Sequence, residues 1–457
     1  MQENNFQINL ITFGCRLNTL ESELIRKYAT IAKLNKSTNV FIFNTCAVTK
    51  EAERQVAQSV RKYKKNNPDS IIILTGCSAN ASTEKYFNMP EIDFVIGNKE
   101  KCLQETYNNI KNILFDENCC NKKIDNKIFV GRVENSIKDN DLLDYSVNNF
   151  TDRTRAFIQI QQGCQNRCTF CIIPYLRGNS ISFTKQQIFQ QIKTVVDNGY
   201  KEIVITGIDI ASYGDKRLDA TPLADLLIDI IKSFPEIERI RLSSLDPAYN
   251  YDKLLNLAKD SKKILPHFHL SLQHASNNVL RLMGRRHTRE QALKLCKKIK
   301  KKIGKHVAIG ADIITGFPNE SENDFKSLIK FIKQAKITHL HTFVYSPRPK
   351  TFAFDHFVDN VPKQIAKQRA RIIRNIAKNN MRQLMRISEK KVQYVLLENN
   401  GTTGYTENYI KCNVHNKEVN KNQNNDIIEL KPNNIVKVKI NKKRIIDNQE
   451  LDGVVIK

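Results

Sequence analysis

The sequence has no apolar run that approaches ~20 residues, the length that a helix needs to cross a bilayer. Residues 1–5 bring neither a basic segment nor a long apolar one, so they do not resemble a secretory signal. We therefore expect a cytoplasmic protein without a membrane partner. Its 11 cysteines should stay reduced there and be available as metal ligands.

Acidic residues are too few to balance the basic ones. The chain has 47 Asp and Glu against 73 Lys and Arg, a formal net charge of +26. The excess is concentrated in two stretches, 281–305, where Glu290 is the one acid, and 363–386, which has none. Charge of this size indicates a polyanionic partner, nucleic acid first, although solvated helix faces also carry such runs.

Three closely spaced cysteines, Cys164, Cys168 and Cys171, follow a run with the alternation of a strand, residues 156–160. They should therefore lie in a loop at the C-terminal end of a strand, where α/β folds place their chemistry. Three thiolates are too few for a structural zinc site, which takes four ligands, and are typical of an iron–sulfur cluster with one open iron. Zinc with a fourth ligand elsewhere in the chain is the alternative.

Cys15, Cys46 and Cys77 each end an apolar run of strand length and are followed by helix-competent polar stretches. Such a βα repeat should place one thiol at the top of each parallel strand, about 5 Å from its neighbour. Any one of these cysteines alone would be read as a core residue. Three in register predict a second metal cluster. The runs are 8–14, 40–45 and 71–76.

The other five cysteines lack this placement. Three lie in helix-like or strand-like stretches and are predicted to be core residues, and an adjacent pair lies in the polar linker 116–152. We assign none of them a ligand role. The five are Cys102, Cys119, Cys120, Cys296 and Cys412.

After the cysteine loop, strand-like runs alternate with helical spacers. With run 156–160 they make six βα units, which fit an incomplete (β/α) barrel open on one side to a large substrate. The further runs are 202–206, 239–242, 268–272, 307–314 and 340–345.

The loops after these strands carry residues suited to ligand contact, although ordinary turn chemistry explains each of them alone. His267 and His269, which alternate on one strand, are interpreted as packed or solvent-facing and receive no ligand role. The candidates are Gly207, Asp209, Ser243, Ser244, Gln273 and Gly316.

The tail begins with a basic segment, 363–386, that predicts a helix, and continues from about 388 as short β-rich runs. Such runs predict a small barrel or sandwich. Tyr405 and Tyr409 beside Lys411 are suited either to stack on bases or to pack in a small core. The runs are 392–397, 404–410, 427–430, 435–440 and 453–456.

On these motifs the chain resembles one family over nearly its full length, the radical S-adenosylmethionine (SAM) methylthiotransferases. Phe170 in the cysteine loop fits the family pattern, and residues 404–409 match the signature of the TRAM module. Residues 14–18 and 171–180 are most similar to enzymes that act on N6-threonylcarbamoyladenosine in tRNA. The resemblance implies an α/β fold: an N-terminal parallel domain, a partial (β/α)6 radical SAM barrel and a small all-β barrel. The implied ranges are 1–116 for the methylthiotransferase domain, 150–385 for the radical SAM core and 388–457 for the TRAM-like RNA-binding domain.

The resemblance also implies the cofactors. Cys164, Cys168 and Cys171 would hold a [4Fe-4S] cluster that cleaves SAM to a 5′-deoxyadenosyl radical, which removes hydrogen from C2 of the modified adenine beside the anticodon. Cys15, Cys46 and Cys77 would hold an auxiliary [4Fe-4S] cluster that presents sulfur for methylation, so that each turnover uses two SAM. Phe170 and the six loop candidates would contact SAM, and no separate catalytic side chain is assigned.

The implied partners are the tRNA anticodon loop and an electron donor such as a flavodoxin or ferredoxin. The same chemistry on isopentenyladenosine in tRNA, or on a ribosomal-protein aspartate, is a first alternative. A zinc-stabilised RNA-binding protein without catalysis is a second. The proposed reaction requires that the two trios of cysteines, each holding a cluster, face a common chamber.

Overall fold

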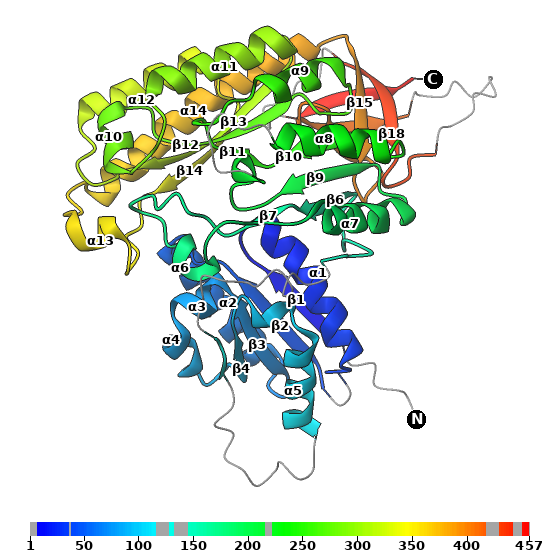
Figure 1. The fold of residues 1–457 in the computed structure, drawn as a ribbon, viewed down its shortest axis with the longest axis vertical. Helices are drawn as coiled ribbons and strands as arrows, with labels where there is room; N and C mark the ends of the chain where they lie inside the picture. Colours follow the sequence, from blue (N-terminus) through cyan, green and yellow to red (C-terminus); the bar gives the residue numbers. More distant parts are fainter. Residues whose placement is uncertain are drawn as a thin grey trace. The chain divides into compact units, whose positions relative to one another are not determined.

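The computed structural model describes residues 7–35, 38–115, 128–131, 145–214, 222–416, 429–441 and 450–456 (Figure 1). The described residues form two compact units. The first takes in segments 1–149, 162–183 and 346–351, and the second takes in 150–161, 184–345 and 352–457. The cysteine loop thus belongs to the first unit, although the strand that precedes it belongs to the second. The three sequence-based domain ranges stay a prediction.

A five-stranded parallel sheet, in the order β1-β2-β3-β4-β5, forms the centre of the first unit. Its two middle strands, β2 and β3, are buried throughout, as expected for a parallel sheet with both faces covered. Ile42 packs in one apolar cluster and Phe43 in another, because successive side chains point to opposite faces of the sheet. The strands are β1 (Ile8–Thr12), β2 (Val40–Thr45), β3 (Ile71–Gly76), β4 (Phe94–Ile96) and β5 (Ile128–Phe129).

Helices follow the strands of this sheet, so the βα repeat predicted from the sequence is confirmed. Thr49 caps the second helix by accepting a hydrogen bond from the backbone N–H of Ala52. The helices of the first unit are α1 (Arg16–Ile31), α2 (Lys50–Asn66), α3 (Cys77–Ala81), α4 (Thr83–Phe87), η1 (Glu100–Cys102), α5 (Gln104–Phe115) and α6 (Ile173–Arg177).

The second unit contains the predicted barrel strands, all parallel, in two sheets ordered β10-β9-β6 and β11-β12-β13-β14. An isolated parallel bridge, Ile240 to Ile264, lies at the point where the two sheets meet. The six strands expected from the sequence are confirmed, with ends displaced by at most one residue. The strands are β6 (Arg155–Gln159), β9 (Glu202–Thr206), β10 (Arg239–Leu242), β11 (Ser244–Leu245), β12 (His267–Gln273), β13 (Ala308–Thr315) and β14 (His339–Val344). Two short strands, β7 (Gln161–Gln162) and β8 (Ile181–Ser182), come before and after the cysteine loop in the chain.

Helices cover the outer face of these strands, with α11, α12 and α14 lying over β12, β13 and β14 (Figure 1). Capping boxes begin α7, α11 and α12, because Thr184, Thr288 and Ser321 each exchange hydrogen bonds with the residue three positions later. The helices are α7 (Lys185–Asp197), η4 (Ile210–Ser212), α8 (Pro222–Ser233), α9 (Asp252–Asp260), α10 (Asn277–Leu282), α11 (Arg289–Ile303), α12 (Glu322–Ala335), α13 (Phe352–His356) and α14 (Lys363–Ser388). None of the helices in the described part of the chain combines the length and apolarity needed to cross a membrane.

The tail forms a closed barrel in the order β15-β16-β17-β19-β18, so the barrel rather than the sandwich is confirmed. Cys412 and Val438 lie in its apolar core. The expected strand 404–410 is wrong in its second half, since the strand ends at Thr406 and the chain turns through Tyr409, whose φ is 66°. Of the expected strand 427–430, residues 429 and 430 are not in a strand and the other two lie outside the described residues. The strands are β15 (Val392–Leu397), β16 (Thr403–Thr406), β17 (Lys411–His415), β18 (Ile435–Ile440) and β19 (Leu451–Val455).

Candidate functional site

The first trio of cysteines lies where the sequence predicted, at the C-terminal ends of three adjacent parallel strands. Cys15 immediately precedes α1, Cys46 directly follows β2, and Cys77 follows β3 as the first residue of α3. The turn before Cys15 comes close to Cys46, because a Cβ added at Gly14 would lie 3.1 Å from the Cys46 Sγ. Burial, and next the neighbouring Cys77 thiol, raise the pKa of Cys46 to about 12, so a metal that binds there releases a proton.

The second trio lies in a loop that folds back on itself. The Cys164 N–H donates to the carbonyl of Gly178 at 3.1 Å, and the Cys171 N–H donates to the carbonyl of Cys168 at 3.0 Å. Gly163 starts the loop with a φ of 71°, and a Cβ there would lie 1.9 Å from the carbonyl oxygen of Asn179. Glycine is thus required at this position, and all three thiols are half-buried rather than enclosed.

The segments that carry the two trios pack against one another within the first unit. Ala47, Cys77, Ile172 and Leu176 form one buried apolar cluster. Ala47 directly follows Cys46, and Ile172 directly follows Cys171 in the sequence. The segments that carry the two trios are therefore in contact at the C-terminal edge of the sheet, although about ninety residues separate Cys77 from Cys164 in the chain.

Arg177 connects the two segments with buried polar contacts. It ends α6, six residues after Cys171, and its Nε donates to the Cys77 Sγ at 3.3 Å. Its two terminal nitrogens donate to the two carboxylate oxygens of Glu21 at 2.7 and 2.9 Å, and one of them also donates to the Asn18 Oδ1 at 2.9 Å. A bidentate arginine of this kind fixes both position and orientation.

The charges around Glu21 leave one positive charge in excess. Lys101, which is also fully buried, donates to Glu21 at 2.6 Å and to Asn98 at 2.9 Å. Asn98 in turn donates to the Cys77 Sγ at 3.6 Å. Burial disfavours an ionised Glu21, but Arg177 and Lys101 outweigh it and lower the pKa of Glu21 to about 2. Two cations and one carboxylate therefore lie behind Cys77, a balance that favours an anionic group in that place.

The number of cysteines in each trio suits a cluster with one open iron better than a structural zinc site, which takes four protein ligands. Among the described residues, one group of three metal-ligating side chains has its ligand atoms within 4.8 Å of one another, and it contains no cysteine.

Two of the sequence candidates for SAM contact lie after β9. The Asp209 N–H donates to the Gln161 Oε1 at 2.9 Å, and a Cβ at Gly207 would lie 2.9 Å from the carbonyl oxygen of Gln161. Gln161 thus explains why residue 207 is glycine. Phe170 lies half-buried in the cysteine loop of the other unit.

The remaining candidates lie at or just beyond the C-terminal ends of β10, β12 and β13. Ser243 is buried, and its Oγ has no hydrogen-bond partner among the described residues, which suits a ligand contact. Ser244 begins β11, and Gln273 ends β12 with a φ of 67°. Packing alone explains the glycine at position 316, because a Cβ there would lie 2.3 Å from the Ala366 Cβ of α14.

The structure places both tyrosines of the tail signature against the barrel strands. The rings of Tyr405 and Tyr409 stack at 4.8 Å, and Arg155 and Arg241 lie over them at 4.7 and 4.4 Å respectively. His339 shares a hydrogen bond of 3.0 Å with the carbonyl of Tyr409. Both rings are half-buried and lie outside the apolar core cluster of the small barrel, so they do not pack in that core, which was one of the two alternatives left open by the sequence, but against arginines of β6 and β10.

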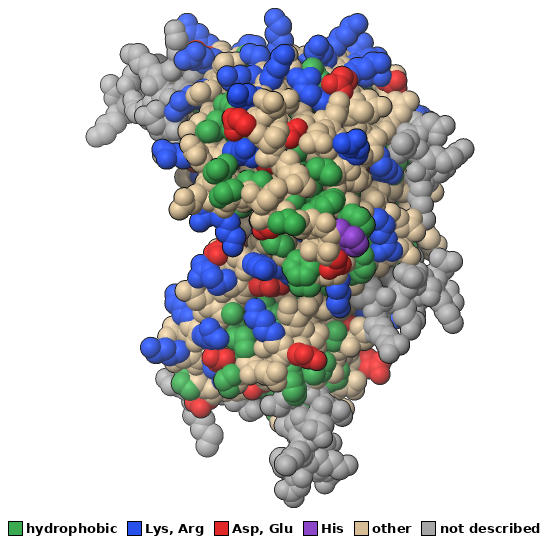
Figure 2. Space-filling view, turned by 90° about the vertical axis from the view of Figure 1, so that its left-hand side faces the viewer, with side chains coloured by type: hydrophobic (Ala, Val, Ile, Leu, Met, Phe, Trp, Pro, Cys, Tyr) green, Lys and Arg blue, Asp and Glu red, His purple; other side chains and the backbone are tan. Residues whose placement is uncertain are grey.

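Basic side chains form an exposed stripe along α14. Their spacing of three or four residues places them on one face of the helix, whereas Arg369 is buried and paired with Glu320. Figure 2 shows Lys and Arg crowded at the end of the second unit where α11 and α14 lie in Figure 1. The members of the stripe are Lys363, Lys367, Arg371, Arg374, Lys378, Arg382 and Arg386.

Sequence reasoning missed the network behind Cys77. Arg177 and Asn18 lie in the two segments whose residues carried the family resemblance, 14–18 and 171–180. Nothing local in the sequence pairs either of them with Glu21 or Lys101. The buried positions of Cys102, Cys296 and Cys412 confirm their interpretation as core residues. Cys119 and Cys120 lie outside the described residues.

Comparison with protein families gives two matches. Residues 158–332 match the radical SAM superfamily, and residues 7–97 match an uncharacterized protein family, UPF0004. Among solved structures, the radical SAM methyltransferase TsrM from Kitasatospora setae has a TM-score of 0.55 at 10% identity, covering 76% of this chain and 74% of its own. That likeness concerns the fold alone.

Curated relatives match nearly the whole chain. The threonylcarbamoyladenosine tRNA methylthiotransferase MtaB of Rickettsia prowazekii is 42% identical over 90% of this chain and 92% of its own length. MtaB of Bacillus subtilis is 32% identical, with 88% of each chain covered. A tRNA-2-methylthio-N6-dimethylallyladenosine synthase from Pelagibacter ubique is also 32% identical, over 86% of this chain and 87% of its own length.

Proposed function

The chain belongs to the radical SAM tRNA methylthiotransferases, and from this premise we propose that its substrate is N6-threonylcarbamoyladenosine next to the anticodon. The methylthio group is added at C2 of that adenine. The observation that carries the proposal is the 42% identity over 90% of the chain to a relative named for this nucleoside, against 32% for a relative named for dimethylallyladenosine.

The cofactors of the family are SAM and two [4Fe-4S] clusters. We assign Cys164, Cys168 and Cys171 as ligands of the first cluster, and Cys15, Cys46 and Cys77 as ligands of the auxiliary one. When bound, the first would supply reductive cleavage of SAM and the auxiliary one would present sulfur for methylation, with two SAM used per turnover. The count of three cysteines in each trio and the packing of Ala47 and Ile172 in one buried cluster support this assignment.

The chain's own residues orient these groups. Arg177 holds Cys77 and Glu21 in place and counters the charge of a thiolate. Ser243 offers a buried hydroxyl for SAM, and the other proposed SAM contacts are Phe170, Gly207, Asp209, Ser244, Gln273 and Gly316.

The stripe on α14 is proposed to contact phosphates of the tRNA whose anticodon loop carries the substrate. Contacts of this kind weaken as salt increases. The TRAM-like barrel would add further phosphate contacts. A flavodoxin or ferredoxin would supply electrons.

Nucleoside analysis of tRNA tests the substrate. A strain without the gene should lose 2-methylthio-N6-threonylcarbamoyladenosine and accumulate the unthiolated nucleoside, and wild-type protein should restore it. Loss of the methylthio group from isopentenyladenosine instead would transfer the proposal to that nucleoside. An unchanged tRNA profile would reject both.

Cysteine variants test the division of roles. Cys168→Ala should abolish SAM cleavage, whereas Cys46→Ala should keep the release of 5′-deoxyadenosine and lose methylthiolation. Cys296→Ala is the matched control, since that thiol is buried in α11 without a ligand role, and it should keep both activities. Iron and sulfide close to two cubanes per chain are expected; a colourless zinc protein that folds stably would favour the non-catalytic alternative.

A further inference from the structure

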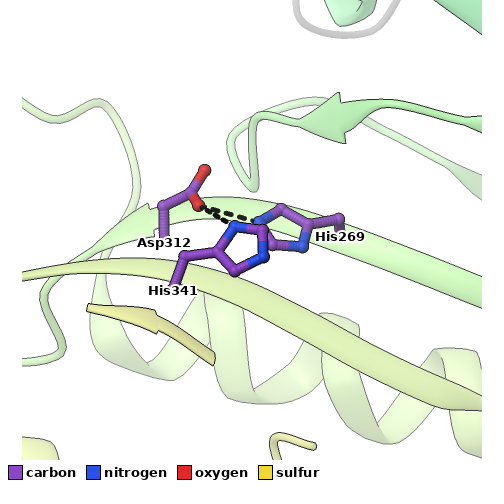
Figure 3. Close-up of side chains that lie close together, drawn as sticks. All are labelled: His269, Asp312 and His341. Atoms are coloured by element: carbon purple, nitrogen blue, oxygen red, sulfur yellow. Dashed lines mark hydrogen bonds and ion pairs between the residues drawn. The ribbon is translucent and has the colours of Figure 1, made fainter. Parts of the chain in front are cut away.

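Three potential metal ligands lie side by side on three adjacent strands of the sheet β11-β12-β13-β14. They are His269 on β12, Asp312 on β13 and His341 on β14, which point toward one another in Figure 3. The strand register explains this meeting. Asp312 pairs with His341 and Gly310 pairs with His269, and residues two apart on a strand share one face.

Gly310 makes room for the His269 imidazole. A Cβ at that position would lie 2.3 Å from the His269 Nδ1, so any other residue would displace the ring. The ring instead lies beside Asp312, and its centroid is 4.8 Å from that of His341. On its other side His269 is confined by His267, at 6.4 Å between centroids.

The distances match those around one divalent ion. The Asp312 Oδ1 lies 3.0 Å from the His269 Nε2 and 3.1 Å from the His341 Nδ1, and all three ligand atoms lie within 4.8 Å of one another. Ligands at about 2.0–2.2 Å from a tetrahedral zinc ion are about 3.3 Å apart. Two histidines and a carboxylate are also the donor set that zinc and similar divalent transition metals take.

The environment favours an anionic oxygen that a metal can reach. Burial opposes ionisation of Asp312, but hydrogen bonds from His269 and His341 outweigh it and hold the pKa of this carboxyl well below its usual range. The His269 side chain is 6% exposed and that of His341 is 62% exposed. The site is therefore anchored on its buried side and open on the other.

We propose that His269, Asp312 and His341 bind one divalent transition-metal ion, zinc or a similar metal, separate from the cysteine-bound iron. Three protein ligands leave a position for water or for a substrate atom, as in open zinc sites. The proposal does not depend on the substrate of the methylthiotransferase. It gives His269 a ligand role that sequence reasoning did not assign.

Metal analysis of the full chain tests the site. The protein is purified without oxygen, its iron–sulfur clusters are reconstituted, and it is dialysed against Zn²⁺. We expect one zinc per chain in addition to the full iron content. Zinc-edge X-ray absorption should show a nitrogen and oxygen shell at about 2.0–2.1 Å and no sulfur shell at about 2.3 Å, which separates this site from zinc in the cysteine trios.

Two variants and a control decide the ligands. His341→Ala and Asp312→Asn should weaken zinc binding on the order of tenfold or more, since even changes around the ligands cost about that much. His415→Ala is the matched control, because His415 pairs with Asp452 at 2.9 Å but has no third ligand beside it among the described residues. Circular dichroism and iron content check the fold of each. Absence of the extra zinc, a sulfur shell, or unchanged binding in His341→Ala with an intact fold would overturn the proposal.

Discussion

Two fully buried glutamates, one in each unit, lie among more positive charges than they neutralise, and the excess serves different purposes. In the first unit Glu21 is paired with Arg177 and Lys101, and the guanidinium continues to the sulfur of Cys77. In the barrel Glu202 is paired with Arg241 at 2.8 Å and lies 3.6 Å from Arg239. The first arrangement leads to a candidate metal ligand.

The second arrangement leads to a protein contact. Arg239 donates to the carbonyl of Tyr394 at 2.7 Å, and Arg241 lies over the ring of Tyr409. Both tyrosines belong to the small C-terminal barrel. A buried carboxylate thus orients arginines in both places, and what the free side of the guanidinium meets decides whether it acts on a ligand or attaches a domain.

The largest change should follow removal of the carboxylate in the first unit. Glu21→Ala leaves Arg177 and Lys101 buried without their partner, so the free energy of unfolding should fall by about 3–5 kcal/mol. Chemical denaturation of the full chain measures this, with Glu23→Ala on the same helix as control, whose carboxylate pairs with the partly exposed Arg26. A change below about 1 kcal/mol would show that the network does not stabilise the unit.

Low pH should disrupt the pairing of Glu21 with Arg177 and Lys101. The pKa of Glu21 is depressed to about 2 in the folded chain, so its contribution is complete above the unfolded value of 4.5 and disappears as pH falls toward 2. The loss amounts to about 3 kcal/mol, because each pKa unit corresponds to about 1.4 kcal/mol. Unfolding free energies at decreasing pH should show a steeper decline in wild type than in Glu21→Gln, and parallel declines would contradict this assignment.

Removing the Tyr409 ring, which contacts Arg241 of β10, should destabilise the protein less than Glu21→Ala, and the effect should be confined to the C-terminal barrel. Tyr409→Ala removes stacking on Tyr405, the contact with Arg241 and packing against His267, at a cost of about 2 kcal/mol. Limited proteolysis should release the C-terminal barrel faster than in wild type, while the iron content stays the same. Tyr394→Ala, an exposed tyrosine of β15, is the control and should leave proteolysis unchanged.

The smallest effect on stability is expected for Arg177→Lys, which keeps the charge but not the bidentate geometry. We expect about 1–2 kcal/mol of destabilisation. The auxiliary cluster should respond more clearly, with an altered reduction potential or iron retention at unchanged SAM cleavage. If Arg177→Lys left both cluster properties at wild-type values, the contact to Cys77 would be structural only.

Much of this architecture could be predicted from local patterns. The strands before Cys15, Cys46 and Cys77 could be predicted because a short run of β-branched and aromatic residues is a property of a few neighbouring positions. The strand 404–410 was wrong in its second half because Thr406 bonds locally to Asn408 and Ile410 and ends the ladder. Patterns of hydropathy do not register such side-chain bonds.

The sequence by itself determined the two cysteine trios, the order of βα units, the basic helix and the β-rich character of the tail, since spacing and periodicity are properties of neighbouring residues. The tertiary structure alone decided that the cysteine loop joins the first unit, that Arg177 reaches Cys77, and that His269 meets Asp312 and His341. Each of these depends on strand register or on the packing of distant segments, and the energy of a buried charge or a shared ligand exists only after those segments have come together.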